Sequence, residues 1–345
     1  MKRIVNILQI AFTYIGTIVG AGFATGQEIL QFFTQYGRWA TLTIVFSALL
    51  FIWLGTKMMM TAYRIKARSY EDLNQKLFGA SAGKWITWFT LIIMIGVNSV
   101  MLAGAGSVFV EHLNLHYQTG LLLTLLGTYL LLGRGIRSIL QLNSIVVPCM
   151  ILLSIIIISS TFMMPTAGNF ITLTTDHSSL RAWFSPLLYT AFNLSMAQAV
   201  LVPIGSQSYS EGVIRWGGIL GGAGVGFLLL AAHFAMSAHM PGIQQFEIPM
   251  GHLAFQLGRL VQMIYVAVIF LEIFSTFVAD IYGMSLQLKQ HFRVPQRLLT
   301  LLIMGTCYSI SQFGFSSLLS VLYPLFGCFS LLWLIRLMTI GRSHR

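Results

Sequence analysis

The stretch IGTIVGAGFATGQEI, residues 15–29, lies where a helix that crosses a membrane would run without interruption. It carries glycines at Gly16, Gly20 and Gly22, and then a carboxylate, Glu28. Glycine tolerates conformations that interrupt a helix, and in lipid the freed amides and carbonyls need a ligand or a cavity. A lone GxxxG is more often a close-packing helix face. The third glycine and the polar residues after it favour a broken helix.

The composition places the chain in a membrane. Hydrophobic residues make up 56% of the 345 residues, charged residues make up 8%, and the mean hydropathy is +0.80. Soluble proteins carry about a quarter charged residues, so that class is excluded. The net charge of +11 does not indicate nucleic acid as a partner, because the basic residues lie in the gaps between apolar runs. The lipid bilayer is the expected surrounding.

Ten apolar segments predict an all-α integral membrane protein with ten spans in a single domain, 1–345. An even number of spans places both termini on one side. Of the 20 Lys and Arg residues, all but Arg38, Arg181 and Arg259 fall on that side. Positive charge is enriched on the cytoplasmic side, so we expect cytoplasmic termini and a location in the cell membrane. The expected spans are 5–35, 39–62, 84–111, 119–133, 138–163, 183–205, 213–238, 257–288, 297–313 and 316–340.

The spans divide into two sets of five with opposite topology, about 5–163 and about 183–340. Inverted repeats of this kind occur in secondary transporters, where a discontinuous helix stands at the same place in each half. We therefore expect breaks in the first and the sixth span. The sixth has no glycine at its middle, and its Asn193, Ser195 and Gln198 equally suit hydrogen bonds between helices.

Three connections between spans are longer than turns, and two of them, 164–182 and 239–256, are expected to face outward. Residues 64–79 have mixed charge and helical spacing of apolar residues, which predicts an amphipathic helix on the inner surface. Residues 239–256 contain two prolines and then a short apolar stretch, which predicts an outer loop with a capping helix.

A broken helix offers two kinds of ligand group. The freed amides at the start of the second half-helix carry positive partial charge and favour a carboxylate. The freed carbonyls at the end of the first half-helix suit a cation. One break can therefore hold a substrate and an ion together.

The segment GTIVGAGF, residues 16–23, resembles the first-helix signature of the amino acid–polyamine–organocation superfamily. With ATGQEI attached, it is similar to the YkvI-type membrane proteins, a family described as amino-acid permeases with the LeuT fold. The resemblance covers the layout of all ten spans, and its specific motif is about a dozen residues.

The resemblance implies that the amides of Ala21 and Gly22 receive a substrate carboxylate. It also implies that the carbonyls of Gly16 and Val19 contribute to a sodium site against the eighth span. The fifth span has no lysine, which some proton-coupled relatives place at the sodium position, so sodium is favoured. The residues expected to line the substrate site are Gly20, Ala21, Gly22, Phe23, Asn98, Phe192, Asn193 and Ser195.

The eighth span carries the second half of the expected cation site. Ser275 and Thr276 stand where sodium-coupled relatives have adjacent hydroxyls, and Glu272 lies on the same helical stripe. A carboxylate inside an apolar span costs at least about 2.5 kcal/mol, so it should face an ion, a cavity or a partner. Glu272 then either strengthens the cation site or carries a proton. The structural alternative is a hydrogen bond to a nearby hydroxyl or histidine, such as His233.

Two further carboxylates are candidate gates. Asp280 lies nearer the cytoplasm and suits an inner gate with Lys2 or Arg3, or a solvated charge at the interface. Glu28 suits an outer gate, or a charge that complements the dipole of the second half-helix. The sequence does not separate these roles.

The expected function is sodium-coupled symport of a small amino acid or related carboxylate. The alternatives are proton-coupled transport through Glu272 and a nutrient-sensing receptor with the same fold. We expect no enzyme, no cofactor and no metal other than the sodium ion, because no catalytic triad or metal-binding spacing is recognisable. Oligomeric state is left open.

Overall fold

The computed structural model describes residues 2–67, 69–132, 137–208 and 210–340, and within these ranges every regular element is a helix. The first expected repeat contains α1 (Lys2–Ile18), α2 (Ala21–Thr25), α3 (Gln27–Phe32), η1 (Thr34–Tyr36), α4 (Arg38–Leu50), η2 (Phe51–Gly55), α5 (Thr56–Ile65), α6 (Tyr70–Phe78), α7 (Ala80–Leu113), α8 (Tyr117–Leu132) and α9 (Arg137–Thr161). The remainder contains η3 (Pro165–Gly168), α10 (Asn169–Thr172), α11 (Ser179–Ser206), α12 (Glu211–Ser237), η4 (Gly242–Gln245), α13 (Pro249–Gln256), α14 (Arg259–His291), α15 (Gln296–Ser311) and α16 (Phe315–Thr339).

Each of the ten expected spans corresponds to helix. In the described ranges, six helical segments are long and apolar enough to cross a membrane on their own, and a seventh is α9 taken with η3 and α10, which bend by 109°. The other three expected spans are α15, α8 and the interrupted first span, whose helices reach at most 17 residues. A multi-pass membrane protein is confirmed, and the crossings by these three shorter segments stay predictions.

The first span is interrupted twice. Val19 and Gly20 separate α1 from α2, as the glycine cluster predicts. The second interruption, at Gly26, was not predicted. Gly26 has φ +87°, a left-handed conformation that glycine adopts without strain, and a Cβ there would overlap the side chain of Met250 in α13. The first span therefore consists of three short helices set at different angles.

The second span contains a wide helical turn, the π-helical η2. Tyr14 of α1 inserts its ring beside Gly55, where any Cβ would overlap it, and its hydroxyl donates to the Phe51 carbonyl at 2.7 Å. A π turn frees carbonyls from the regular ladder, and here one of them accepts the Tyr14 hydroxyl. This contact fixes α1 against the second span.

The sixth span is continuous, so the predicted second break is wrong. Its helix, α11, runs through Ser179–Ser206 without interruption. Asn193 donates to the Tyr189 carbonyl at 3.0 Å, and the Ser195 hydroxyl donates to the Phe192 carbonyl at 2.8 Å. Both side chains bond a carbonyl of their own helix and leave its backbone hydrogen bonds in place. No glycine in the middle of the span permits an interruption.

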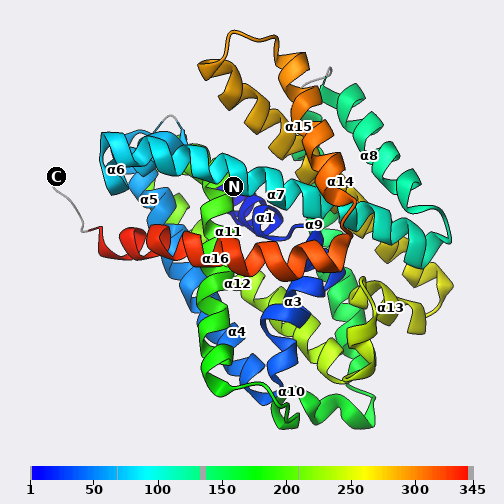
Figure 1. Cartoon of the computed structure of the whole chain (residues 1–345). Helices are drawn as coiled ribbons and strands as arrows, with labels where there is room; N and C mark the ends of the chain where they lie inside the picture. Colours follow the sequence, from blue (N-terminus) through cyan, green and yellow to red (C-terminus); the bar gives the residue numbers. More distant parts are fainter. Residues whose placement is uncertain (1, 68, 133–136, 209, 341–345) are drawn as a thin grey trace.

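The broken first span lies in the middle of the molecule (Figure 1). Helix α1 packs mainly on α12 and also touches α11 and α9, while α11 packs along α16. Many residues at the break and on its neighbours are fully buried, among them Val19, Tyr14 and Tyr189. The hydrophobic core therefore surrounds an interruption that leaves backbone groups unpaired.

The predicted helix in the 64–79 connection is confirmed as α6, and Asn74 joins it to two spans. This buried amide accepts from the Trp333 indole at 2.9 Å and donates to the Thr87 hydroxyl at 3.4 Å. We expect Asn74→Leu to lower the free energy of unfolding by about 1–3 kcal/mol, because the buried indole N–H loses its acceptor. Thermal unfolding of the protein in detergent measures this, with the exposed Lys76→Gln as control. Equal stability of the two variants would contradict the assigned role of Asn74.

Candidate functional site at the first-helix break

The backbone at the break has unpaired groups of both kinds. The Val19 amide still donates to Ile15 at 2.8 Å, and the Gly20 amide turns back to the Ile18 carbonyl at 3.0 Å. No described amide donates to the carbonyls of Gly16 or Val19. Likewise, the amides of Gly22 and Phe23 donate to no described backbone carbonyl. Carbonyls therefore end α1 and amides begin α2, which is the arrangement expected from the sequence.

Glu28 folds back from α3 onto the first turn of α2. A Cβ on Gly22 would overlap the Glu28 carboxylate, so the absence of a side chain at Gly22 makes room for it. Glu28 is only 3% exposed, and its Oε2 has no hydrogen-bond partner among the described residues. The phenol groups of Tyr189 and Tyr323 lie beside this carboxylate, although the Tyr189 hydroxyl forms no well-aligned hydrogen bond. The predicted candidate gate thus lies at the break itself.

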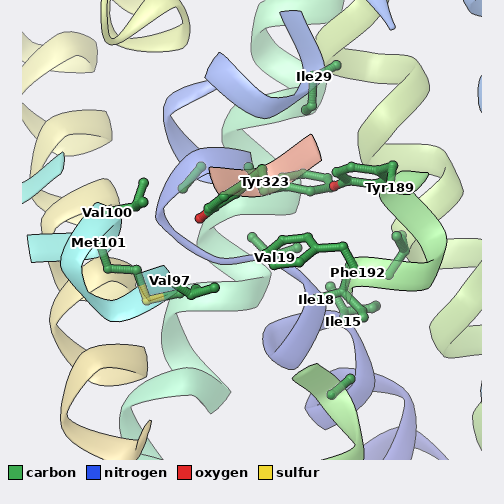
Figure 2. Close-up of a cluster of buried hydrophobic side chains, with 14 of the residues drawn as sticks. Ile15, Ile18, Val19, Ile29, Val97, Val100, Met101, Tyr189, Phe192 and Tyr323 are labelled. Carbon is green, nitrogen blue, oxygen red and sulfur yellow. The ribbon is translucent and has the colours of Figure 1, made fainter. Parts of the chain in front are cut away.

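Apolar and aromatic side chains enclose the break. Figure 2 shows Val19 between Met101 of α7 and Phe192 of α11, with Tyr323 of α16 close by. The rings of Phe192 and Tyr323 are 4.5 Å apart between centroids. A Cβ on Gly20 would stand 3.0 Å from the Met101 methyl group. Phe192 therefore lies beside the break in the first span, and the surroundings of the break are largely apolar.

The other polar residues expected in the substrate site bond elsewhere. Asn98 of α7 donates to Asp280 of α14 at 3.0 Å and to the Met94 carbonyl at 2.8 Å. The Ser195 hydroxyl also bonds Ser330 of α16 at 2.8 Å. With Asn193 bonded inside its own helix, none of the three points an unpaired donor at the break. Their assignment to the substrate site stays a prediction.

The expected cation residues share one face of α14. Helical spacing puts Tyr265, Glu272 and Thr276 on nearly the same side, and the Tyr265 hydroxyl donates to the Ala24 carbonyl of α2 at 3.4 Å. Glu272 is fully buried, and both of its carboxylate oxygens and the Thr276 hydroxyl lack partners among the described residues. The Ser275 hydroxyl donates to the Glu272 carbonyl at 3.2 Å. No hydrogen bond among the described residues joins this face to Gly16 or Val19.

Two pairings considered from the sequence do not occur. The ring nitrogens of His233 lie 3.1 Å from the Thr34 hydroxyl and 3.2 Å from the Thr41 hydroxyl. His233 is therefore not the hydrogen-bond partner of Glu272. Asp280 bonds Asn98, and the Arg3 guanidinium lies beside Gly212. The Lys2 side chain falls outside the part that the structure describes. Asp280 is therefore tied to α7, which removes Arg3 as its gate partner in this conformation.

The connection 239–256 forms the predicted loop with a capping helix, as η4 and α13. Glu111 at the end of α7 accepts from the amides of Glu247 and Ile248 at 2.8 and 3.0 Å. The Ser107 hydroxyl donates to the Glu247 carboxylate at 2.6 Å. Burial, and then the nearby His239, lower the pKa of His252 in this cap. These contacts hold the cap against α7, and Met250 of the cap reaches the second interruption at Gly26.

A cavity of about 430 Å³ opens between α3, the first half of α11 and α16. It ends at Ser185 and Leu188, within one helical turn of Tyr189. Its lining residues are Gln31, Phe32, Gln35, Tyr36, Leu180, Arg181, Phe184, Ser185, Leu188 and Pro324. No pattern in the sequence indicates this cavity. Tyr323 and Met101 were not identified either, because their closeness to the break depends on how α7 and α16 pack.

The fold is similar to that of a solved manganese transporter. The crystal structure of the Eremococcus coleocola manganese transporter in complex with an aromatic bis-isothiourea substituted compound matches 96% of this chain and 77% of its own, with a TM-score of 0.59 and 15% identity. At that identity the likeness shows the fold alone.

The sequence relatives are closer. The uncharacterized membrane protein YkvI of Bacillus subtilis is 39% identical over 326 residues, which cover 94% of this chain and 92% of that protein. The uncharacterized protein YyaD of the same organism is 26% identical over 327 residues, covering 94% of each chain. No protein-family model matches the chain. The chain belongs to the YkvI family of membrane proteins.

Proposed function

We propose that the chain is a secondary active transporter that binds a small amino acid or related carboxylate at the break between α1 and α2. The observation that carries the proposal is a helix interruption placed in the buried centre of a transporter fold, with unpaired carbonyls before it and unpaired amides after it. Such groups are costly in lipid unless a ligand satisfies them. The manganese of the structural neighbour is not carried over, because only the fold is shared.

Substrate entry needs movement around the break. Phe192, Tyr323 and Met101 fill the space beside it in this conformation (Figure 2). The cavity between α3, α11 and α16 reaches Ser185 and Leu188, within one helical turn of Tyr189, and the cap is held on the end of α7. We propose an occluded state that opens alternately to the two sides, with the two five-helix sets as inverted repeats and cytoplasmic termini in the cell membrane. The continuous α11 limits the helix breaks in this scheme to the first repeat.

The coupling ion is proposed to bind on the α14 face that carries Glu272 and Thr276. Three oxygen atoms there lack partners, and oxygen ligands suit a hard cation such as sodium. A buried carboxylate without a partner is also the arrangement expected of a proton carrier, which keeps proton coupling through Glu272 as the second candidate. A receptor of the same fold would bind the ligand without moving it.

A ligand screen tests the proposal. Purified protein is heated with each of the common amino acids in sodium chloride or in potassium chloride, and unfolding is followed. We expect one or a few small amino acids to raise Tm, and to do so only in sodium, because a ligand that binds the folded state stabilises it by linkage.

The possible results separate the candidates. Equal stabilisation in sodium and in potassium that varies with pH would indicate coupling to a proton instead of sodium. Stabilisation without accumulation in proteoliposomes would favour the receptor. If no amino acid or carboxylate raises Tm in either salt, the proposed substrate class is wrong.

A further inference from the structure

Glu28 is a buried carboxyl group with no cation beside it in the described part of the chain. Its side chain is 3% exposed, and its Oε2 has no partner in the described part of the chain. The ion pair found among the described residues joins Arg64 and Glu211 at a distant surface. A buried carboxylate is strongly disfavoured without a compensating charge or hydrogen bonds. The break therefore contains a position where a positive group would be stabilised.

The groups around Glu28 add no positive charge. The titratable side chains that face it are Tyr189 from α11 and Tyr323 from α16, both neutral phenols. On α12, His233 is the titratable group near this end of α3, and its ring is bonded to Thr34 and Thr41. Helix α2 contributes Gly22, against which the carboxylate lies. No described lysine or arginine is bonded to it.

The same groups are suited to an organic ammonium ion. Tyr189 packs against Phe33 with centroids 5.1 Å apart, and Phe192 packs against Tyr323 at 4.5 Å. Aromatic faces attract ammonium groups, and a carboxylate beside them supplies a charge-assisted hydrogen bond. A small inorganic cation would need several more oxygen ligands than this largely apolar enclosure offers.

We propose that Glu28 binds the ammonium group of the substrate, so that the site takes amines and zwitterions and rejects carboxylates that lack an amine. The inference rests on the proposed function and narrows its substrate class. An α-amino acid carries its ammonium and carboxylate on the same carbon. Glu28 lies against the first turn of α2, so one such molecule spans the carboxylate and the freed amides. A simple carboxylate instead meets like charge from Glu28.

Matched ligand sets test the proposal on the full-length wild-type protein. One set is alanine, propionate and ethylamine, and the other is leucine, 4-methylpentanoate and 3-methylbutylamine. Each acid lacks only the ammonium of its amino acid, and each amine lacks only the carboxylate. We expect the better-bound amino acid to have a Kd at least about tenfold lower than its deaminated acid, the size of one charge-assisted hydrogen bond.

The variant Glu28→Gln keeps the shape of the side chain and removes its charge. We expect it to raise the Kd of the amino acid about tenfold or more, with no such loss for the deaminated acid. Glu211→Gln, which removes an exposed carboxylate, is the control and should leave both Kd values unchanged.

The results distinguish this proposal from the proposed function. Equal affinity of the wild type for an amino acid and its deaminated acid would overturn the role of Glu28 and leave a carboxylate transporter standing. Retention of the amine preference in Glu28→Gln would also overturn it. If neither these six ligands nor any other common amino acid binds the wild type, both proposals fail. The comparison of the wild type's affinity for an amino acid with its affinity for the deaminated acid can overturn the proposal even if Glu28→Gln does not fold.

Discussion

Gly22→Ala abolishes amino-acid binding and leaves the protein folded: this is the largest effect we expect from any single substitution at the break. The added Cβ would overlap the Glu28 carboxylate, which is the end of a flexible side chain and can be displaced without moving the backbone. The displaced carboxylate leaves the ammonium position and intrudes on the space of the ligand. We expect the ligand-induced rise in Tm to disappear while the Tm without ligand changes by a few degrees at most.

Gly305→Ala is the matched control for this substitution. Gly305 lies in α15, and a Cβ there meets nothing within 4 Å. Alanine is favoured over glycine in a helix by up to about 1 kcal/mol, so this variant should bind ligand normally and unfold at an equal or higher temperature. Normal ligand binding by Gly22→Ala would show that the ligand site lies elsewhere.

Glu272→Gln is expected to remove the sodium dependence of ligand binding. The substitution keeps the size of the side chain but replaces a carboxylate, both of whose oxygens are buried and unpaired, by a neutral amide. Where sodium stands at about 100 times its Kd, its binding contributes about 2.7 kcal/mol to the folded state, and this contribution should be lost. Paired thermal-unfolding curves in sodium and potassium measure the difference directly.

Thr306→Val controls for a polar group lost elsewhere in the membrane region. The exposed Thr306 of α15 bonds the Leu302 carbonyl of its own helix, so its loss should leave the sodium effect intact. If Glu272→Gln responds to sodium as the wild type does, the α14 face is not the cation site. If sodium does not affect ligand binding by the wild type, and Glu272→Gln removes a pH dependence of that binding, the coupling ion is a proton.

Hydrophobicity and charge were sufficient to predict where the helices lie. Apolar runs of membrane length and the positions of lysine and arginine set the ten segments, and each coincides with helix in the structure. The break at Gly20 was also predictable, since its glycine cluster is followed by polar residues within the same span. The break expected in α11 was inferred from the first span, on the assumption that the two halves are symmetric. It does not occur, and Asn193 bonds a carbonyl of its own uninterrupted helix.

The site was less predictable because it depends on contacts between distant segments. Sequence identified Glu28 as a charge in an unusual place, but its position against Gly22 follows from the second interruption, at Gly26. Tyr323 comes from the last span and gives no local signal. Asn98 and Asp280 were assigned to different roles, yet they form one hydrogen bond between α7 and α14. Polar pairs of this kind become visible only when the helices are packed.

Uptake into proteoliposomes is the most direct test that the break is the substrate site of a transporter. The amino acid that stabilises the protein most is supplied in radiolabelled form outside vesicles loaded with potassium, with sodium outside. We predict accumulation above the external concentration by the wild type and by Gly305→Ala, its collapse when the sodium gradient is dissipated, and no uptake by Gly22→Ala. Equal accumulation by Gly22→Ala, or binding by the wild type without any uptake, would contradict the account.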